Sequence, residues 1–152
     1  MDIKRITEVG IAVRSLDAAT ELFEQLFDAD IGEIQVVEQY SMRFRMCRVG
    51  KVDFEVMEPT GEKGVIAEFI RKRGEGLHHV AFAVDDINET MSTLRSKSVE
   101  FVGGAPMREC LDVVDFAGRH FNEEIQFTFS HPASILGILF EFIQYPNGYR
   151  VS

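Results

Sequence analysis

The chain has 152 residues, of which 45% are hydrophobic and 27% charged, and its formal net charge at pH 7 is −9. This length allows one well-buried core, and the composition is typical of a soluble globular protein. The negative charge argues against nucleic acid as a partner, because phosphates would be repelled over most of the surface.

Neither a membrane partner nor secretion is expected. The longest apolar run, ILGILF at 135–140, is far shorter than the roughly 20 residues of a membrane helix, and the start, MDIKRITEVG, lacks the apolar segment of a secretory signal. The two cysteines, Cys47 and Cys110, have no CxxC spacing, which fits a reducing compartment. We therefore expect a cytoplasmic protein.

The first predicted element is a strand in TEVGIAV (7–13), where bulky and small side chains alternate. Its bulky side carries Val9, Ile11 and Val13, and its other side carries Glu8, Gly10 and Ala12. A helix follows with Ser15 as the N-cap residue, because apolar side chains recur at helical spacing. These are Leu16, Ala19, Phe23, Leu26 and Phe27. Three more strands are predicted, at 33–39, 43–49 and 53–58.

The second half repeats this order after a linker, 59–75, that holds a short helix at Val65–Arg73. A strand in GLHHVAFAV (76–84) places His79 and two alanines on one side, and Asp86 and Glu89 form a capping box for the next helix. Further strands are predicted at 99–102, 124–130 and 137–144, and an irregular loop at 103–123 because of its glycines and proline.

The two halves share one construction, since aligning GIAV with AFAV places Glu8 against His79. Each first strand thus carries one side chain able to bind a metal, followed by two small residues on the same side. A lone glutamate of this kind is most often solvated, but Glu141 lies between aromatic residues in ILFEFI. An unpaired carboxylate buried there would cost several kcal/mol, so we expect a cation beside it.

The motifs resemble the vicinal oxygen chelate superfamily of glyoxalases, ring-cleaving dioxygenases and bleomycin-resistance proteins, and within it the methylmalonyl-CoA epimerase family. The resemblance covers nearly the whole chain and is carried by VGIAVRSLDAA, FEVMEP, IAEFIRKRGEGLHHVAFAVDDI and FSHPASILGILFEFIQ. It implies an α+β fold in which two tandem βαβββ modules pack edge to edge into a curved mixed sheet around a trough. The modules would span about 5–58 and 76–146 of one domain, 1–152, usually in a homodimer.

The resemblance also implies a divalent metal ion, bound by one residue from the first strand and one from the last strand of each module. The matching positions are Glu8, Glu55, His79 and Glu141. Histidine is usual in the epimerase family at the position of Glu8. Three carboxylates and one imidazole favour hard ions such as Mg²⁺ or Mn²⁺, although Zn²⁺, Co²⁺ and Ni²⁺ also bind such donors.

The implied activity is that of a metal-dependent epimerase or isomerase that removes a proton α to a carbonyl through a metal-stabilised enolate. The substrate would be an acyl-CoA-like small molecule. The resemblance offers Glu141 as one acid/base group and a glutamate of the second strand as the other. That residue is Glu38, unless the register places Gln39 there, and an amide cannot move a proton in this way.

Two alternatives remain open. A glyoxalase I-type lactoylglutathione lyase would act on a thiol adduct, and glutamate at position 8 has the reach of the glutamine that some glyoxalases carry there. A metal-free protein of the bleomycin-resistance type would only bind its small molecule. A ring-cleaving iron dioxygenase is less favoured, because that chemistry normally uses two histidines and one carboxylate, and only His79 is present.

Overall fold

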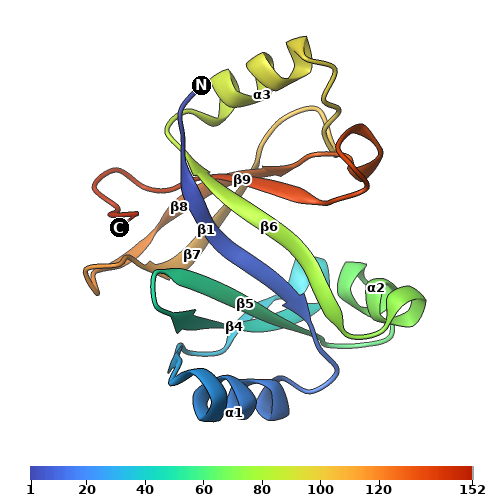
Figure 1. Cartoon of the computed structure of the whole chain (residues 1–152), viewed down its shortest axis with the longest axis vertical. Helices are drawn as coiled ribbons and strands as arrows, with labels where there is room; N and C mark the ends of the chain where they lie inside the picture. The colour runs from blue at the N-terminus through green and yellow to red at the C-terminus, as the bar shows by residue number, and fades with distance from the viewer. Residues whose placement is uncertain (152) are drawn as a thin grey trace. The chain divides into compact units, whose positions relative to one another are not determined.

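The computed structural model describes residues 1–151, which fold as two compact units (Figure 1). The Glu8 unit is Glu8–His78, and the His79 unit is Met1–Thr7 together with the chain from His79 onward. Each unit contains helices and a sheet of mixed strand direction, as expected for the α+β class. No helix among residues 1–151 has the length and apolar character needed to cross a membrane.

Two helices, a single 3₁₀ turn and five strands contribute to the Glu8 unit. These are β1 (Ile3–Ala12), α1 (Leu16–Phe27), β2 (Asp30–Ile31), β3 (Gln35–Val37), η1 (Glu38–Tyr40), β4 (Met42–Val49), β5 (Val52–Pro59) and α2 (Val65–Arg73). The strand order is β2-β4-β5-β1, and β3 also pairs with β4. β1 runs parallel to β5, whereas β4 is antiparallel to each of its partners.

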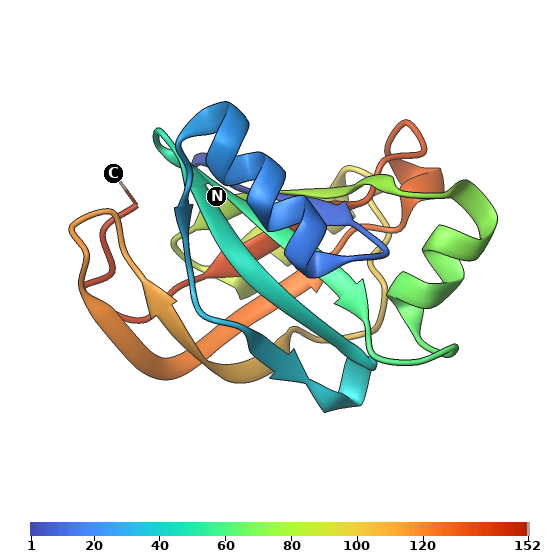
Figure 2. The same cartoon turned by 90° about the horizontal axis from the view of Figure 1, so that it is seen from below.

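Helix α1 forms where the sequence predicts it. The Ser15 hydroxyl accepts a hydrogen bond from the Ala18 N–H at 3.2 Å, and Asp28 ends the helix in the left-handed conformation with φ 50°. α1 lies across β4 and β5 (Figure 2), and its apolar side chains pack on the bulky face of the sheet. The core there is Val13, Leu16, Ala29, Cys47 and Val56.

Two residues of the predicted apolar face of α1 are exposed instead. Leu26 is 66% exposed and Phe27 54% exposed, although the ring of Phe27 still contacts that of Phe23 edge-on at 5.5 Å. The face that packs on the sheet is set by Leu16, Ala19 and Phe23, and the last turn extends beyond it.

The predicted strand 33–39 is wrong over most of its length. β3 has only three residues, and Glu38–Tyr40 form the 3₁₀ turn η1. The reason is the chain reversal, since Val37 pairs antiparallel with Met42 and only four residues are left to close the hairpin. Ser41 adopts φ 50° and donates its N–H to the Glu38 carbonyl at 3.0 Å. By contrast, the helix expected at Val65–Arg73 is confirmed.

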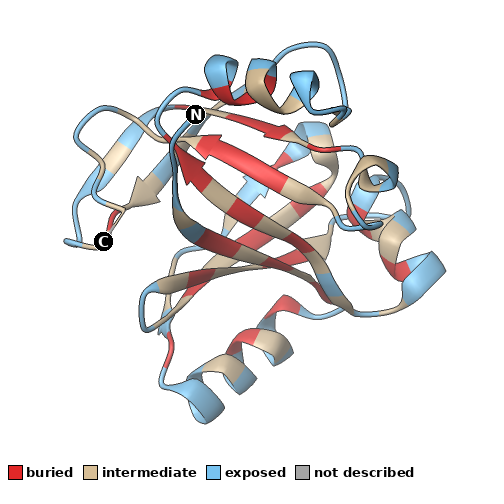
Figure 3. Cartoon of the chain, turned by 45° about the horizontal axis from the view of Figure 1, so that its top comes forward, coloured by how far each residue is buried: buried red, intermediate tan, exposed pale blue. Residues whose placement is uncertain are grey.

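The His79 unit repeats the pattern of a sheet with a helix on one face. Its elements are β6 (Gly76–Val84), α3 (Ile87–Ser96), β7 (Met107–Val114), β8 (His120–Phe129), η2 (Pro132–Ser134) and β9 (Phe140–Gln144). The strand order is β6-β9-β8-β7, with β6 parallel to β9 and β8 antiparallel to both neighbours. Buried residues concentrate on the strands and on the helix sides that face them (Figure 3).

Helix α3 has its predicted N-cap but only half of the capping box. The Asp86 carboxylate accepts from the Glu89 N–H at 2.9 Å, whereas the Glu89 carboxylate accepts from the amino group of Met1 at 2.6 Å. α3 covers the bulky face of β6 and β9, where Val84, Ile87, Met91 and Phe142 are buried together.

The loop expected at 103–123 is wrong, because it contains β7 and the start of β8, which pair along their whole length. Exposed polar side chains alternate along this hairpin, and its glycines lie before β7 and in the turn at Gly118. These turn residues favoured a loop over the two strands in the sequence-based prediction. The strand expected at 99–102 is reduced to one bridge, between Phe101 and Ser130. The strand expected at 137–144 begins only at Phe140.

Candidate metal and acid/base site

In the Glu8 unit, the two predicted ligands lie on the sheet face away from α1. β1 and β5 pair so that Gly10 lies opposite Glu55 and Glu8 lies opposite Asp53. Residues in register on neighbouring strands share a face, so Glu8, Gly10 and Glu55 all project to the same side. Glu8 is buried at 7% exposure, and Glu55 is partly buried. The predicted alternation of β1 is therefore confirmed.

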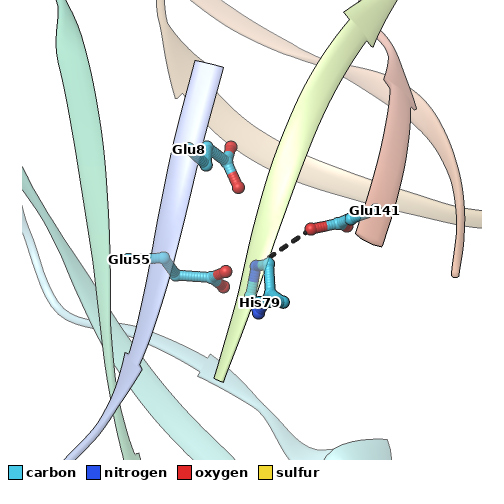
Figure 4. A group of neighbouring side chains, drawn as sticks. All are labelled: Glu8, Glu55, His79 and Glu141. Atoms are coloured by element: carbon cyan, nitrogen blue, oxygen red, sulfur yellow. Dashed lines mark ion pairs between the residues drawn. The ribbon is translucent and has the colours of Figure 1, made fainter. Parts of the chain in front are cut away.

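In the His79 unit, the other two predicted ligands are in contact. The Nε2 atom of His79 lies 3.0 Å from a carboxylate oxygen of Glu141, the pair joined by a dashed line in Figure 4. The two residues are 3% and 6% exposed. The ring of Phe129 stands edge-on to the His79 ring at 5.7 Å and covers it. The side chain beside Glu141 is thus an imidazole, and a cationic partner for this carboxylate stays a prediction.

The two units place their ligands with the same offset. In the Glu8 unit, Glu55 lies opposite Gly10, two residues after Glu8. In the His79 unit, Glu141 lies opposite Ala81, two residues after His79. The small residues thus stand directly beside the two last-strand carboxylates, where a larger side chain would occupy the space that each carboxylate needs.

All four predicted ligands belong to one group of side chains that could hold a metal ion (Figure 4). One ligand atom from each of Glu8, Glu55, His79 and Glu141 can be chosen so that the four atoms lie within 4.8 Å of one another. Three carboxylates and one imidazole fit a divalent cation by their chemistry, because buried carboxylates such as those of Glu8 and Glu141 require a compensating positive charge.

The second acid/base candidates lie apart from these strands. Glu38 and Gln39 are both exposed and belong to η1, the turn between β3 and β4. Glu38 is not a member of the four-residue group. Sequence reasoning expected this residue on a strand, and the chain reversal at Ser41 places it in a loop instead.

Sequence reasoning missed a partly buried ion pair on the same face as Glu8. Arg48 donates from Nε to one oxygen of Asp53 at 2.8 Å and from Nη2 to the other at 3.0 Å. The side chain of Asp53 is 7% exposed and that of Arg48 is 20% exposed. The available signal was the spacing of Asp53 and Glu55, which puts two carboxylates on one face of β5.

The sequence of this chain matches a known protein family. Residues 7–116 match the model of the glyoxalase/bleomycin resistance protein/dioxygenase superfamily. The mitochondrial methylmalonyl-CoA epimerase of Dictyostelium discoideum is 26% identical over 140 residues, which are 91% of this chain and 77% of that protein. The ethylmalonyl-CoA/methylmalonyl-CoA epimerase of Cereibacter sphaeroides is 26% identical over 143 residues, 93% of this chain and 98% of that protein.

Solved structures of epimerases are also similar to this chain. A methylmalonyl-CoA epimerase in complex with methylmalonyl-CoA and NH4+ matches with a TM-score of 0.82 and 25% identity over 97% of this chain and 99% of that one. A variant of the Streptomyces coelicolor enzyme in complex with 2-nitronate-propionyl-CoA matches with a TM-score of 0.78 and 26% identity over 94% and 98%. The expectations of an α+β fold of this kind and of an enzyme of the epimerase type are confirmed. The chain belongs to the glyoxalase/bleomycin resistance protein/dioxygenase superfamily.

Proposed function

We propose that this protein is a metal-dependent epimerase acting on a malonyl-CoA substituted at its α-carbon, with methylmalonyl-CoA as the first substrate to test. The observation that carries the proposal is the group of three carboxylates and one imidazole on the sheet faces away from the helices. The similarity to methylmalonyl-CoA epimerases over nearly the whole chain supports the substrate class.

Glu8, Glu55, His79 and Glu141 would hold the ion. A divalent ion there would stabilise the negative charge that develops on a carbonyl oxygen of the substrate as the α-proton leaves. Burial of Glu8, His79 and Glu141 supports this role, because charge stabilisation is strongest where water is excluded. The oxygen-rich donor set favours Mg²⁺ or Mn²⁺.

Epimerisation requires one group to remove the α-proton and another to return a proton to the opposite face of the carbon. We assign the first role to Glu141, whose carboxylate is held at 3.0 Å from His79 inside the protein. We assign the second role to Glu38. Its position in a turn between strands is compatible with an approach to substrate from a different direction, and its neighbour Gln39 cannot carry a proton.

The test is exchange of the α-proton of methylmalonyl-CoA in deuterated water. The metal-loaded wild type is expected to introduce deuterium and to interconvert the two epimers. Glu141→Gln should slow exchange by about 100-fold or more, the usual effect of losing a general acid or base. Glu38→Gln should slow epimerisation to a similar degree, with Gln39→Ala as the matched control that leaves it unchanged. Wild-type protein that introduces no deuterium would exclude the proposal.

Metal content separates this proposal from a metal-free binding protein. Protein purified without chelator is expected to carry about one divalent ion per chain, and His79→Ala should lose it. Equal, near-zero metal in both proteins would favour the binding alternative. The homodimer and the lyase alternative remain predictions, which light scattering and an assay with a glutathione adduct can address.

A further inference from the structure

Glu8 lies at the end of a row of charged residues that crosses the sheet of the Glu8 unit. Glu8 of β1 is in register with Asp53 of β5, and Asp53 is in register with Arg48 of β4. The equivalent row through Glu55 is different, since Glu55 lies between Gly10 of β1 and Met46 of β4. Only Glu8, of these two ligands, faces a second carboxylate across its own strand pair.

In this arrangement the carboxylates of Glu8 and Asp53 would repel each other. Neighbouring strands lie about 4.8 Å apart, and like charges directly opposite each other on one face destabilise a sheet. Glu8 is 7% exposed and Asp53 is 5% exposed, so water screens the two carboxylates poorly. An unrestrained Asp53 would push the Glu8 side chain away, or would compete with it for a cation.

Arg48 counters both the repulsion between the two carboxylates and the competition of Asp53 for a cation. Its guanidinium binds the two oxygens of Asp53 at once, at 2.8 and 3.0 Å, and so occupies them on the side of β4, the strand that lies across β5 from β1. A planar fork can bind a carboxylate at two points, whereas a lysine ammonium is a single point charge. The pair therefore fixes the orientation of Asp53 as well as its charge.

We propose that Arg48 and Asp53 are positioning residues for Glu8. They hold a buried carboxylate beside Glu8 in a neutralised state that can neither displace Glu8 nor bind the ion in its place. This inference rests on the proposed metal site, and it predicts that the contribution of Arg48 to metal binding depends on the residue at position 8.

The first test is the affinity of purified apoprotein for Mn²⁺, measured at one fixed pH by electron paramagnetic resonance of the free ion. Arg48→Met should weaken binding about tenfold, as is typical when a residue that orients a ligand is lost. In a Glu8→Gln background the same substitution should change affinity less than about twofold, because the repulsion on residue 8 is gone.

Matched variants separate positioning from a general effect of charge. Arg48→Met combined with Asp53→Asn should restore affinity to near that of wild type, and Arg48→Lys should fall between wild type and Arg48→Met. If Arg48 acted only as a nearby positive charge, the change in affinity would have the opposite sign. Its removal would then strengthen binding of a divalent cation in every background. Stronger binding by Arg48→Met would overturn the proposal.

The second test needs no metal and distinguishes this inference from failure of the proposed function. In chelator-treated protein, Arg48→Met should lower the melting temperature more when residue 8 is glutamate than when it is glutamine. Equal lowering in both backgrounds would refute the positioning role. If wild type binds no Mn²⁺ but this coupling is present, the proposed function fails and the positioning of Glu8 stands. If Arg48→Met does not fold, Arg48→Lys provides the same comparison.

Discussion

Asp115→Asn is expected to loosen the chain end that follows β9. The Asp115 side chain is fully buried in the turn between β7 and β8. Its carboxylate accepts from the N–H groups of Ala117 and Arg119, both at 2.9 Å, and from Arg150 near the C-terminus at 3.2 Å. The guanidinium of Arg119 also donates to it from Nε at 2.9 Å. One carboxylate thus links the hairpin to the chain end through hydrogen bonds.

The size of the effect follows from these contacts. Hydrogen bonds to a charged group contribute roughly 1.5–3 kcal/mol each, and an amide in place of the carboxylate also turns an N–H₂ group toward a donor. Because Asn retains part of the network, we expect a loss of about 3 kcal/mol rather than the full sum. For a protein of this size that corresponds to a fall in melting temperature of about 9 °C.

The pH dependence has a definite sign. Burial by itself would raise the pKa of Asp115, but the hydrogen bonds from Arg119, Arg150 and Ala117 outweigh it and lower the pKa from 3.8 to about 2. A depressed pKa in the folded state stabilises the protein above the ordinary value. The contribution of Asp115 should therefore be complete above about pH 4 and be lost as the pH falls to about 2.

Thermal melting followed by circular dichroism measures this effect, with Asp112→Asn as the matched control. Asp112 is an exposed residue of the same hairpin, and it pairs with His120 at 3.2 Å. Asp112→Asn should change stability by less than about 0.5 kcal/mol, as is usual for exposed ion pairs. If Asp115→Asn melts within 2 °C of wild type, or if the difference between the two proteins does not shrink below about pH 4, the reasoning is wrong.

Four further outcomes are expected. In native protein a thiol reagent should modify exposed Cys110 quickly and Cys47 only after unfolding, since burial raises the pKa of the Cys47 thiol to about 11. Asp86→Ala should lower stability by about 1 kcal/mol in urea unfolding, because α3 loses its N-cap hydrogen bond. Saturating Mn²⁺ should raise the melting temperature, and chelator should reverse the rise, since an ion that binds only the folded chain stabilises it. Ala81→Val and Ala83→Val should each cost about 1–3 kcal/mol by overpacking. Only Ala81→Val should also weaken Mn²⁺ binding, because Ala81 lies opposite Glu141 whereas Ala83 lies opposite Ile143.

The strands that carry the candidate ligands could be predicted because their signal is local. In VGIAV and HVAFAV, bulky and small side chains alternate, and a helix covers the bulky side in both units. Glu55 and Glu141 were placed by the family resemblance instead, and both lie in strands, although the second strand begins later than expected.

The hairpin of β7 and β8 could not be predicted in this way. Along β7 the exposed positions are Arg108, Cys110 and Asp112, and the residues between them are only partly buried, so no strong apolar face marks the strand. The strand is specified by its pairing with β8, a contact between residues distant in sequence. The shortened strand before η1 has a similar cause, since the length of β3 is limited by the reversal that pairs Val37 with Met42.

This difference explains why the candidate ligands were easier to place on their strands than the candidate for the second acid/base group. A ligand on a strand is positioned by alternation and by the register of two paired strands, and the common offset of Gly10 with Glu55 and Ala81 with Glu141 shows that both units use the same register. Glu38 is positioned by a turn whose geometry depends on where β3 stops. A one-residue shift in that turn would exchange a carboxylate for the amide of Gln39. The position of the proposed proton-transfer group therefore depends on how the hairpin closes, whereas the positions of the proposed ligands depend on strand register in the sheet.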